Sequence, residues 1–256
     1  GADNMTCRVG LIGCGGIGTV HLSAYRDMSN AKIIAVADID KQRASEAAKT
    51  FGADGWYEDY DEILKRDDID MVDVCLPVFL HPKAVIAAAE AGKHVLCEKP
   101  IATTLEDADA MIDATRRAGV KFMIAFMYRF EPLFVRIRQY IDEGTIGTPV
   151  LMWLTNVWRP GFMDPGSTKI WFAEKSKSGG MLVEHACHWI DLFRWWSMDV
   201  ESVFAHTRTL GKGIDIEDNA SIAMKFRNGA FATITQSWSS HLAWNDLGVV
   251  GENGSA

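Results

Sequence analysis

The 256-residue sequence predicts an α/β protein, in which a parallel sheet covered by helices precedes an α+β domain with an open, largely antiparallel sheet. Three observations predict this fold class. Apolar runs alternate with helical patterns over residues 8–125, which is typical of a parallel sheet. Longer strand-like runs dominate after residue 130. Between two of these runs stands Asn228-Gly229, a strong signal for a tight hairpin. We therefore expect domains at 5–125 and 126–256.

In the first domain, strands and helices are expected to follow one another in turn. The apolar strand residues are continuous rather than alternating, which fits burial of a parallel sheet on both faces. Proline and glycine mark the ends of several elements. The expected strands are 8–12, 31–38, 70–77, 94–99 and 121–125, and the expected helices are 19–28, 43–50, 82–91 and 105–118.

The second domain is expected to begin with a helix closed by Gly144 and to continue as a sheet. The expected helices are 132–143 and 181–196, and the expected strands are 149–157, 200–209, 218–226, 230–238 and 246–250. A second Asn-Gly turn at 253–254 is followed by two residues and no returning strand. We therefore expect the sequence to be a fragment of a longer protein, with its second domain incomplete.

Composition excludes several classes of function. A net charge of −8 argues against a nucleic-acid-binding surface. No apolar run approaches the roughly 18 residues of a membrane span, and the first residues lack the pattern of a signal peptide. The five cysteines have no metal-ligand spacing, which favours reduced thiols. We predict a cytoplasmic protein without a metal, a nucleic-acid partner or a membrane partner.

A dinucleotide fingerprint follows the first expected strand. Gly13, Gly15 and Gly18 form G-x-G-x-x-G in "GLIGCGGIG", where the first glycine permits a tight turn. The second lets a pyrophosphate approach the backbone, and the third lets helix and strand pack closely. Asp38 ends the next strand at the spacing expected of a residue that binds the adenosine ribose. Its carboxylate would repel a 2′-phosphate, which favours NAD over NADP.

Two later strands end in candidate cofactor contacts. In open α/β sheets, ligands bind outside the carboxyl ends of the strands. Lys99 ends one of these strands in "HVLCEKP", and Pro77 and His81 follow the neighbouring strand in "LPVFLHP". Taken alone, a lysine like Lys99 is more often a solvated surface residue, and His81 is more often an N-terminal residue of a helix.

A polar stripe interrupts the apolar helix expected at 181–196. Glu184, His188 and Asp191 lie at i, i+4 and i+7, on one face of an α-helix. Histidine, with a pKa near 6.5, suits the removal of a proton from an alcohol at neutral pH. A buried structural histidine is the alternative. A zinc site built from neighbouring residues is disfavoured, because His185 points about 100° away from the stripe.

These segments together resemble the glucose-fructose oxidoreductase / inositol dehydrogenase / MocA family along essentially the whole chain. The matching segments are "GLIGCGGIG", "VADID", "LPVFLHPKAVIAAAEAGKHVLCEKPIATT", "YRFEP", "EGTIGTP", "GGMLVEHACHWIDL" and "EDNASIAMKFRNG". The resemblance implies a Rossmann domain followed by an α/β domain whose open sheet often forms oligomer contacts. It also implies an NAD(P)-linked oxidoreductase acting on a sugar, a cyclitol or a related polyol.

The family's functional positions carry over residue by residue. The resemblance places the fingerprint glycines on Gly13, Gly15 and Gly18, the ribose-binding acid on Asp38, and the family's Glu-Lys-Pro on Glu98, Lys99 and Pro100. We expect further cofactor contacts from Gly16, Ile17, Ile39, Pro77 and His81. Ile39 replaces the basic residue often seen in NADP-preferring members. The family's acid and histidine fall on Glu184 and His188, but that acid is commonly aspartate. Whether Glu184 orients His188 or contacts the substrate directly is left open.

The expected chemistry is hydride transfer to NAD with proton transfer by Lys99 and His188. Lys99 would stabilise alkoxide charge, and Glu184 or Asp191 would orient the imidazole of His188. We expect substrate contacts from Lys99, Arg159, Glu184, His188 and Asp191. Arg159 belongs to the tryptophan-rich segment 153–166, which is either a substrate loop or aromatic packing of the sheet or of an oligomer interface.

Two other functions compete with a dehydrogenase of this kind. One is NAD-assisted cleavage of a glycoside, in which the cofactor is reduced only transiently. The other is a non-catalytic, nucleotide-binding regulatory protein. Steady release of free sugar without net NADH would distinguish the first alternative, and indifference to the loss of Lys99 and His188 would distinguish the second.

Overall fold

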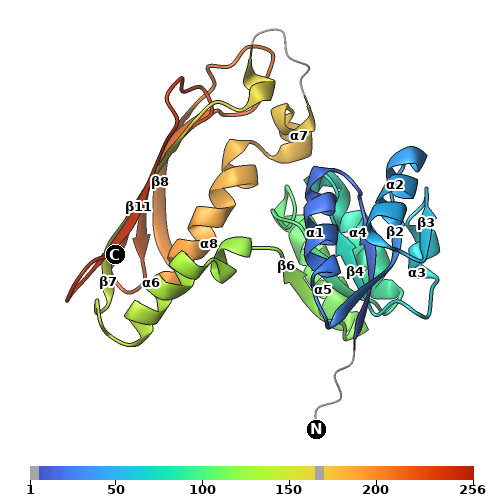
Figure 1. Cartoon of the computed structure of the whole chain (residues 1–256). Helices are drawn as coiled ribbons and strands as arrows, with labels where there is room; N and C mark the ends of the chain where they lie inside the picture. Colours follow the sequence, from blue (N-terminus) through green and yellow to red (C-terminus); the bar gives the residue numbers. More distant parts are fainter. Residues whose placement is uncertain (1–5, 165–169) are drawn as a thin grey trace. The chain divides into compact units, whose positions relative to one another are not determined.

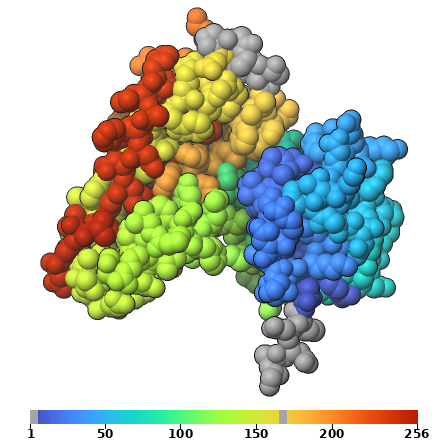
Figure 2. Space-filling view, in the orientation of Figure 1, coloured from blue at the N-terminus to red at the C-terminus, as the bar shows by residue number. Residues whose placement is uncertain are grey.

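The computed structural model describes residues 6–164 and 170–256, and the chain divides into two compact units between Ala125 and Phe126. Each unit has apolar clusters made of its own residues. Figure 1 shows the helices and strands of each unit, and Figure 2 shows the same view with every atom. Among the described residues, no helix is long and apolar enough to cross a membrane.

The first unit alternates strands and helices, as predicted. Its elements are β1 (Cys7–Ile12), α1 (Gly16–Arg26), β2 (Ala31–Ala37), α2 (Lys41–Phe51), β3 (Gly55–Tyr57), α3 (Asp61–Leu64), β4 (Met71–Val74), η1 (Val78–Leu80), α4 (His81–Glu90), β5 (His94–Cys97), α5 (Leu105–Ala118) and β6 (Phe122–Ile124). The sheet order is β3-β2-β1-β4-β5-β6, with every neighbouring pair parallel. The predicted parallel sheet is therefore confirmed.

Local sequence signals explain where these helices begin and end. Asp40 caps α2 by accepting hydrogen bonds from the N–H groups of Gln42 and Arg43. Thr104 caps α5 in the same way, and Gly119 ends that helix with a left-handed backbone. The sequence analysis missed β3 and α3, because three and four residues are too short to show a period.

The second unit is a five-stranded sheet with helices on one face. Its elements are η2 (Met127–Phe130), α6 (Pro132–Asp142), β7 (Pro149–Val157), η3 (Gly161–Met163), η4 (Trp171–Ala173), α7 (Lys175–Ser178), η5 (Leu182–Ala186), α8 (Cys187–Trp196), β8 (Val200–Arg208), β9 (Asn219–Phe226), β10 (Phe231–Ser237) and β11 (Trp244–Gly251). The sheet order is β11-β7-β10-β9-β8. Buried side chains from the inner face of the sheet and from α8 form one core.

The second sheet is largely antiparallel, as predicted, with one parallel pair. That pair is β7 and β10, while the three other pairings are antiparallel. The Asn228-Gly229 turn joins β9 to β10, and Gly229 has a φ of +89° that favours glycine. The predicted hairpin is therefore confirmed, although its loop has three residues, 227–229, rather than two, because the N–H of Phe226 still bonds the carbonyl of Ala230.

The outer face of this sheet carries exposed apolar side chains. Along β9 and β10, buried and exposed residues alternate, so every second side chain points away from the core. Register places Phe204, Phe231 and Leu151 on that outward side, and Trp244 lies there at the start of β11. These four side chains are 42–64% exposed. We call them the outer apolar patch.

The predicted α-helix over 181–196 is wrong in its first part. Leu182–Ala186 is π-helical, and a regular α-helix begins only at Cys187. A π turn takes one more residue than an α turn, so a helical wheel with a single period fails across Cys187. Glu184 therefore does not stand one α-helical turn before His188.

After its last turn the chain pairs briefly with β11, although no returning strand was predicted. Val250 forms an isolated bridge with Ser255, and the backbones of Val249 and Ala256 exchange two hydrogen bonds of 2.9 Å. Figure 2 shows the last residues of the chain, in red, at the surface of the second unit.

Candidate active site

The three fingerprint glycines occupy three different environments in the turn between β1 and α1. Gly13 has a φ of +97°, and a Cβ there would also collide with the carbonyl of Cys75. A Cβ on Gly18 would collide with the carbonyl of Gly13, so helix and turn are in close contact. A Cβ on Gly15 or on Gly16 would meet no atom within 4 Å. The backbone is therefore open at the helix N-terminus, where a pyrophosphate could approach it.

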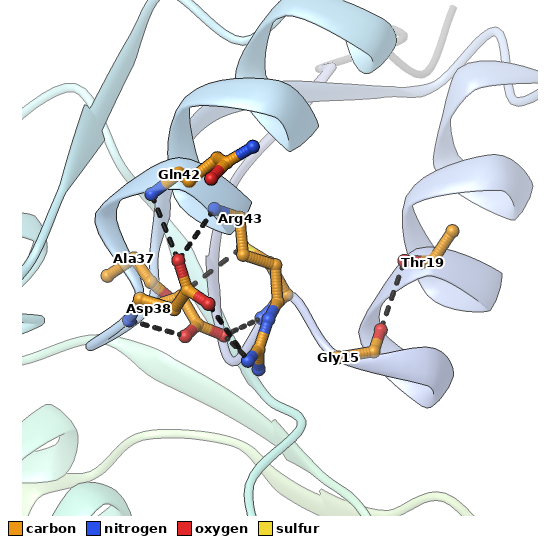
Figure 3. A network of polar contacts seen from close by, with 8 residues as sticks. Gly15, Thr19, Ala37, Asp38, Gln42 and Arg43 are labelled. Atoms are coloured by element: carbon orange, nitrogen blue, oxygen red, sulfur yellow. Dashed lines mark hydrogen bonds and ion pairs between the residues drawn. The ribbon is translucent and has the colours of Figure 1, made fainter.

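Asp38 is bound to this same turn. Its Oδ2 accepts a hydrogen bond of 2.8 Å from the N–H of Cys14, and its Oδ1 accepts one of 2.9 Å from the N–H of Asp40. Figure 3 shows Arg43 of α2 facing Asp38, with a separation of 3.4 Å between Nη1 and Oδ2. Ile39 is 93% exposed beside it. The carboxylate is thus fixed by backbone donors and lies next to a cation that the sequence analysis did not identify.

The loops that follow β4 and β5 meet at His81. This side chain is buried, and its Nδ1 and Nε2 lie 3.0 Å and 2.8 Å from the carbonyls of Pro100 and Leu76. Burial lowers the pKa of His81, against the effect of these carbonyls. Because both ring nitrogens contact the protein's own backbone, a cofactor contact by His81 stays a prediction. Pro77, in the same loop, is the N-cap residue directly before the short helix η1.

Glu98 and Lys99 directly follow β5. Glu98 is buried, and its Oε2 accepts a hydrogen bond of 3.0 Å from the N–H of Lys99. Its Oε1 lies 3.0 Å from Nε2 of His21, a residue of α1. Burial acts to raise the pKa of Glu98, but the hydrogen bond from His21 and the charges of His21 and Lys99 outweigh it and lower this pKa.

His21 lies between two carboxylates. Its Nδ1 is 2.8 Å from Oδ2 of Asp73, a fully buried residue of β4, which also accepts a hydrogen bond of 2.8 Å from the hydroxyl of Tyr25. Burial alone would lower the pKa of His21, but hydrogen bonds to Asp73, Cys75 and Glu98 raise it to about 12. The structure therefore holds His21 as an imidazolium. We call His21, Asp73, Glu98 and Tyr25 the His21 network.

One group in the described residues has donor atoms spaced for a metal ion. The donor atoms of His21, Asp73 and Cys75 all lie within 4.8 Å of one another. Burial raises the pKa of the Cys75 thiol, whereas a metal is bound by the thiolate. The short contacts of His21 and Tyr25 with Asp73 are hydrogen bonds between charged or polar groups, so hydrogen bonding explains this group.

In the second unit, the residues of the predicted polar stripe are all buried. Glu184, His188 and Asp191 are 4%, 7% and 8% exposed. The ring of His188 packs against Tyr128, with 4.7 Å between centroids, and forms a T-shaped pair with Phe126 at 6.3 Å. These aromatic contacts fix the plane of the imidazole from the segment just before α6.

Asp191 forms an ion pair that uses both of its carboxylate oxygens. Arg129 donates from Nε and Nη2 to Asp191 in two hydrogen bonds of 2.7 Å each. The hydrogen bonds to Asp191 raise the pKa of Arg129. Asp191 therefore anchors the Tyr128–Arg129 segment to α8, and its predicted contact with a substrate is not tested.

Two further predicted site features lie in the same unit. Arg159 donates to Oδ1 of Asp164 at 2.9 Å and to the carbonyl of Met163 at 2.7 Å, within its own loop. Its predicted substrate contact likewise stays a prediction. The predicted substrate loop 153–166 lies outside the described residues at positions 165 and 166.

The sequence analysis missed Gln236, which faces the polar stripe's helix from the sheet. Gln236 is 2% exposed on β10, and its Nε2 lies 3.0 Å from Nδ1 of His185. The signal was available in the sequence, because Gln236 is the polar member of an inward-facing row with Ala232 and Ile234. Arg129 and Tyr128 were quoted in "YRFEP" without a role.

Comparison with known proteins identifies both units. A family model described as an oxidoreductase family with an NAD-binding Rossmann fold, GFO_IDH_MocA, matches residues 7–126. The model of the GFO/IDH/MocA C-terminal domain matches residues 134–256. The match with the first model includes the glycine turn, Asp38 and Lys99, and the match with the second includes His188.

Relatives of known sequence and structure agree with these matches. The chain is 33% identical to myo-inositol 2-dehydrogenase of Thermotoga maritima, over 90% of this chain and 68% of that protein. It is 33% identical to levoglucosan dehydrogenase of Pseudarthrobacter phenanthrenivorans, over 91% of this chain and 68% of that protein. A structure of levoglucosan dehydrogenase with NADH and levoglucosan has a TM-score of 0.92 at 32% identity, over 98% of this chain and 72% of that one.

The charge of His21 gives a testable pH dependence. A pKa of about 12 in the folded protein means that His21 stays doubly protonated at pH 9, where a free imidazole is neutral. Because the folded pKa exceeds the unfolded value near 6.5, this contribution to stability is complete below pH 6.5 and declines as the pH rises toward 12. The measurement is the ¹⁵N chemical shift of both ring nitrogens, assigned with His21→Gln. A neutral ring at pH 9 would contradict the network.

Proposed function

The chain belongs to the GFO/IDH/MocA family of oxidoreductases, and from this we propose that it is an NAD-dependent dehydrogenase of a sugar, cyclitol or related polyol. In this proposal a secondary alcohol of the substrate is oxidised. The names of the relatives support it, since they include dehydrogenases of myo-inositol and levoglucosan. The structural observation that carries it is the open backbone at Gly15 and Gly16, next to a carboxylate bound to the same turn.

The first unit would bind and orient the dinucleotide, whose chemistry is acceptance of a hydride. Its pyrophosphate would lie on the N-terminus of α1 at Gly15, Gly16 and Ile17, where helical N–H groups point outward. The adenosine ribose would bind Asp38, because each oxygen of its carboxylate has a second lone pair that can accept a hydrogen bond from a ribose hydroxyl. In the loop after β5, Lys99 would offer an ammonium to the oxygen of the reacting alcohol.

The second unit would supply the base. His188 takes the alcohol proton while Lys99 stabilises the developing alkoxide. Tyr128 and Phe126 hold the ring of His188 in position. Glu184 is the better candidate for orienting the imidazole, because both oxygens of Asp191 are engaged with Arg129. Arg159, Glu184 and Asp191 stay candidates for substrate contact.

Polyol oxidation is the direct test. We expect formation of NADH with at least one member of a panel of inositols, aldoses and anhydrosugars. Lys99→Met and His188→Asn should each lower kcat by about 10²-fold or more, because each removes a group that handles the proton or its charge. Lys212→Met and His241→Asn, at exposed positions, serve as matched controls and should leave the rate unchanged.

Three outcomes would count against this proposal. Full activity in Lys99→Met and His188→Asn would remove both residues from the chemistry. Release of free sugar from a glycoside without net NADH would replace alcohol oxidation by NAD-assisted cleavage. Binding of NAD with no turnover of any kind would favour a regulatory role.

We also propose that NAD is preferred over NADP. Asp38 carries a negative charge where a 2′-phosphate would lie, and Ile39 supplies no compensating cation. Arg43 weakens this repulsion without removing it, because its guanidinium already pairs with Asp38 and Asp40. The expected result is a lower dissociation constant for NAD than for NADP.

Substitution of both Asp38 and Ile39 tests whether charge at these positions determines the preference for NAD. Asp38→Ser with Ile39→Arg should narrow or reverse the difference between the dissociation constants, as measured by fluorescence titration. Lys41→Arg, which keeps the charge in the next helix, is the control. Equal affinities of the unmodified protein for NAD and NADP would refute the argument.

Finally, we propose that the chain forms a homo-oligomer through the outer apolar patch. Monomeric proteins rarely expose large apolar surfaces, and within this patch Phe231 lies opposite Leu151 on the neighbouring strand, with Phe204 on the same sheet face. Phe204→Glu combined with Phe231→Glu should lower the mass measured by light scattering, because burying two carboxylates in an interface is costly. Leu133→Glu, on α6, is the control. An unchanged mass in the double variant would exclude this face.

A further inference from the structure

A continuous set of hydrogen bonds runs from helix α1 to the backbone of Lys99. Tyr25 and His21 of α1 both contact Oδ2 of Asp73, each at 2.8 Å. The other ring nitrogen of His21 contacts Glu98 at 3.0 Å, and Glu98 accepts the N–H of Lys99 at 3.0 Å. The helix that begins at the glycine turn is thereby tied to the loop after β5.

Only a cation suits the position of His21, between the carboxylates of Asp73 and Glu98. A carboxylate accepts hydrogen bonds and donates none, so each contact of His21 requires an N–H on the ring. A doubly protonated ring provides both. It also separates two carboxylates that are 0% and 6% exposed and would otherwise repel each other without screening. Loss of the ring would leave a buried carboxylate without its partner, which is strongly destabilising in proteins.

We propose that His21 is a positioning residue for Lys99, because its imidazolium holds Glu98 and through it the backbone of Lys99 at a fixed place relative to the glycine turn. This inference rests on the proposed role of Lys99 in catalysis. The placement matters because the ammonium must meet the oxygen of an alcohol whose cofactor is bound at that turn. A misplacement of about 1 Å can lower a rate by about 10²-fold.

The alternative is that His21 contributes to stability alone, as other ion pairs in this unit do. Arg8 and Asp70 form such a pair, at 2.6 Å, at the amino ends of β1 and β4. These are the strand ends away from the glycine turn. Removal of this pair should lower stability without affecting Lys99. Arg8→Gln is therefore the matched control for His21→Gln.

The test observes Lys99 directly, without a substrate. The full chain is labelled with ¹³C at lysine Cε, and the Lys99 signal is assigned with Lys99→Arg. In His21→Gln we expect the Lys99 signal to move or to split, and kcat to fall at least about tenfold, with the NAD dissociation constant within about threefold of wild type. In Arg8→Gln we expect an unchanged Lys99 signal and a lower unfolding temperature.

A Lys99 signal that is the same in His21→Gln as in wild type would overturn the proposal, whatever the activity. If His21→Gln does not fold, Glu98→Gln weakens the same link at its other end and should likewise move the signal. Failure of the polyol oxidation leaves this readout intact, because the signal is recorded without substrate. The two proposals can therefore fail separately.

Discussion

Carboxylates at the carboxyl edge of the first sheet can be buried only because N–H and O–H donors meet them. Asp38 after β2 binds the N–H of Cys14, Asp73 in β4 binds His21 and Tyr25, and Glu98 after β5 binds His21 and Lys99. Without these donors each charge would be expelled or neutralised. The edge that would receive a dinucleotide is thus organised by fixed negative groups, and the positions of the glycine turn and of Lys99 follow from them.

The second unit also buries charged and polar side chains, and it pairs them with a different kind of partner. Its polar stripe lies on an apolar helix, where Asp191 is neutralised by Arg129 and His188 is enclosed by aromatic rings. Both partners come from the segment between Phe126 and Phe130, directly after the end of the first unit. His188, the residue of this unit proposed for proton transfer, is therefore held by packed aromatic neighbours, and catalysis by position and charge requires such fixed placement.

Much of this arrangement could be predicted from the sequence. Most of the parts that could not be predicted were hidden for the same reason. Glycine spacing, apolar runs and the Asn228-Gly229 turn are local signals, so the parallel sheet, the fingerprint and the hairpin were accessible. His21 and Asp73 are 52 positions apart, and Glu98 is 77 from His21, so no spacing rule connects them. Arg129 and Asp191, 62 positions apart, were hidden for the same reason. Gln236 could have been identified from the sequence, because the alternation along its strand places it on the inward face, but it was overlooked.

The π-helical turn before α8 separates the orientation of Glu184 from that of His188. Glu184 belongs to the π turn and His188 to the α-helix, so the four-residue interval between them crosses from one helical type to the other. The direction in which Glu184 leaves the helix axis therefore depends on the extra residue of the π turn, while the direction of His188 follows the regular α-helix. One inserted or deleted residue in this turn would rotate Glu184 around the axis and leave His188 and Asp191 in place.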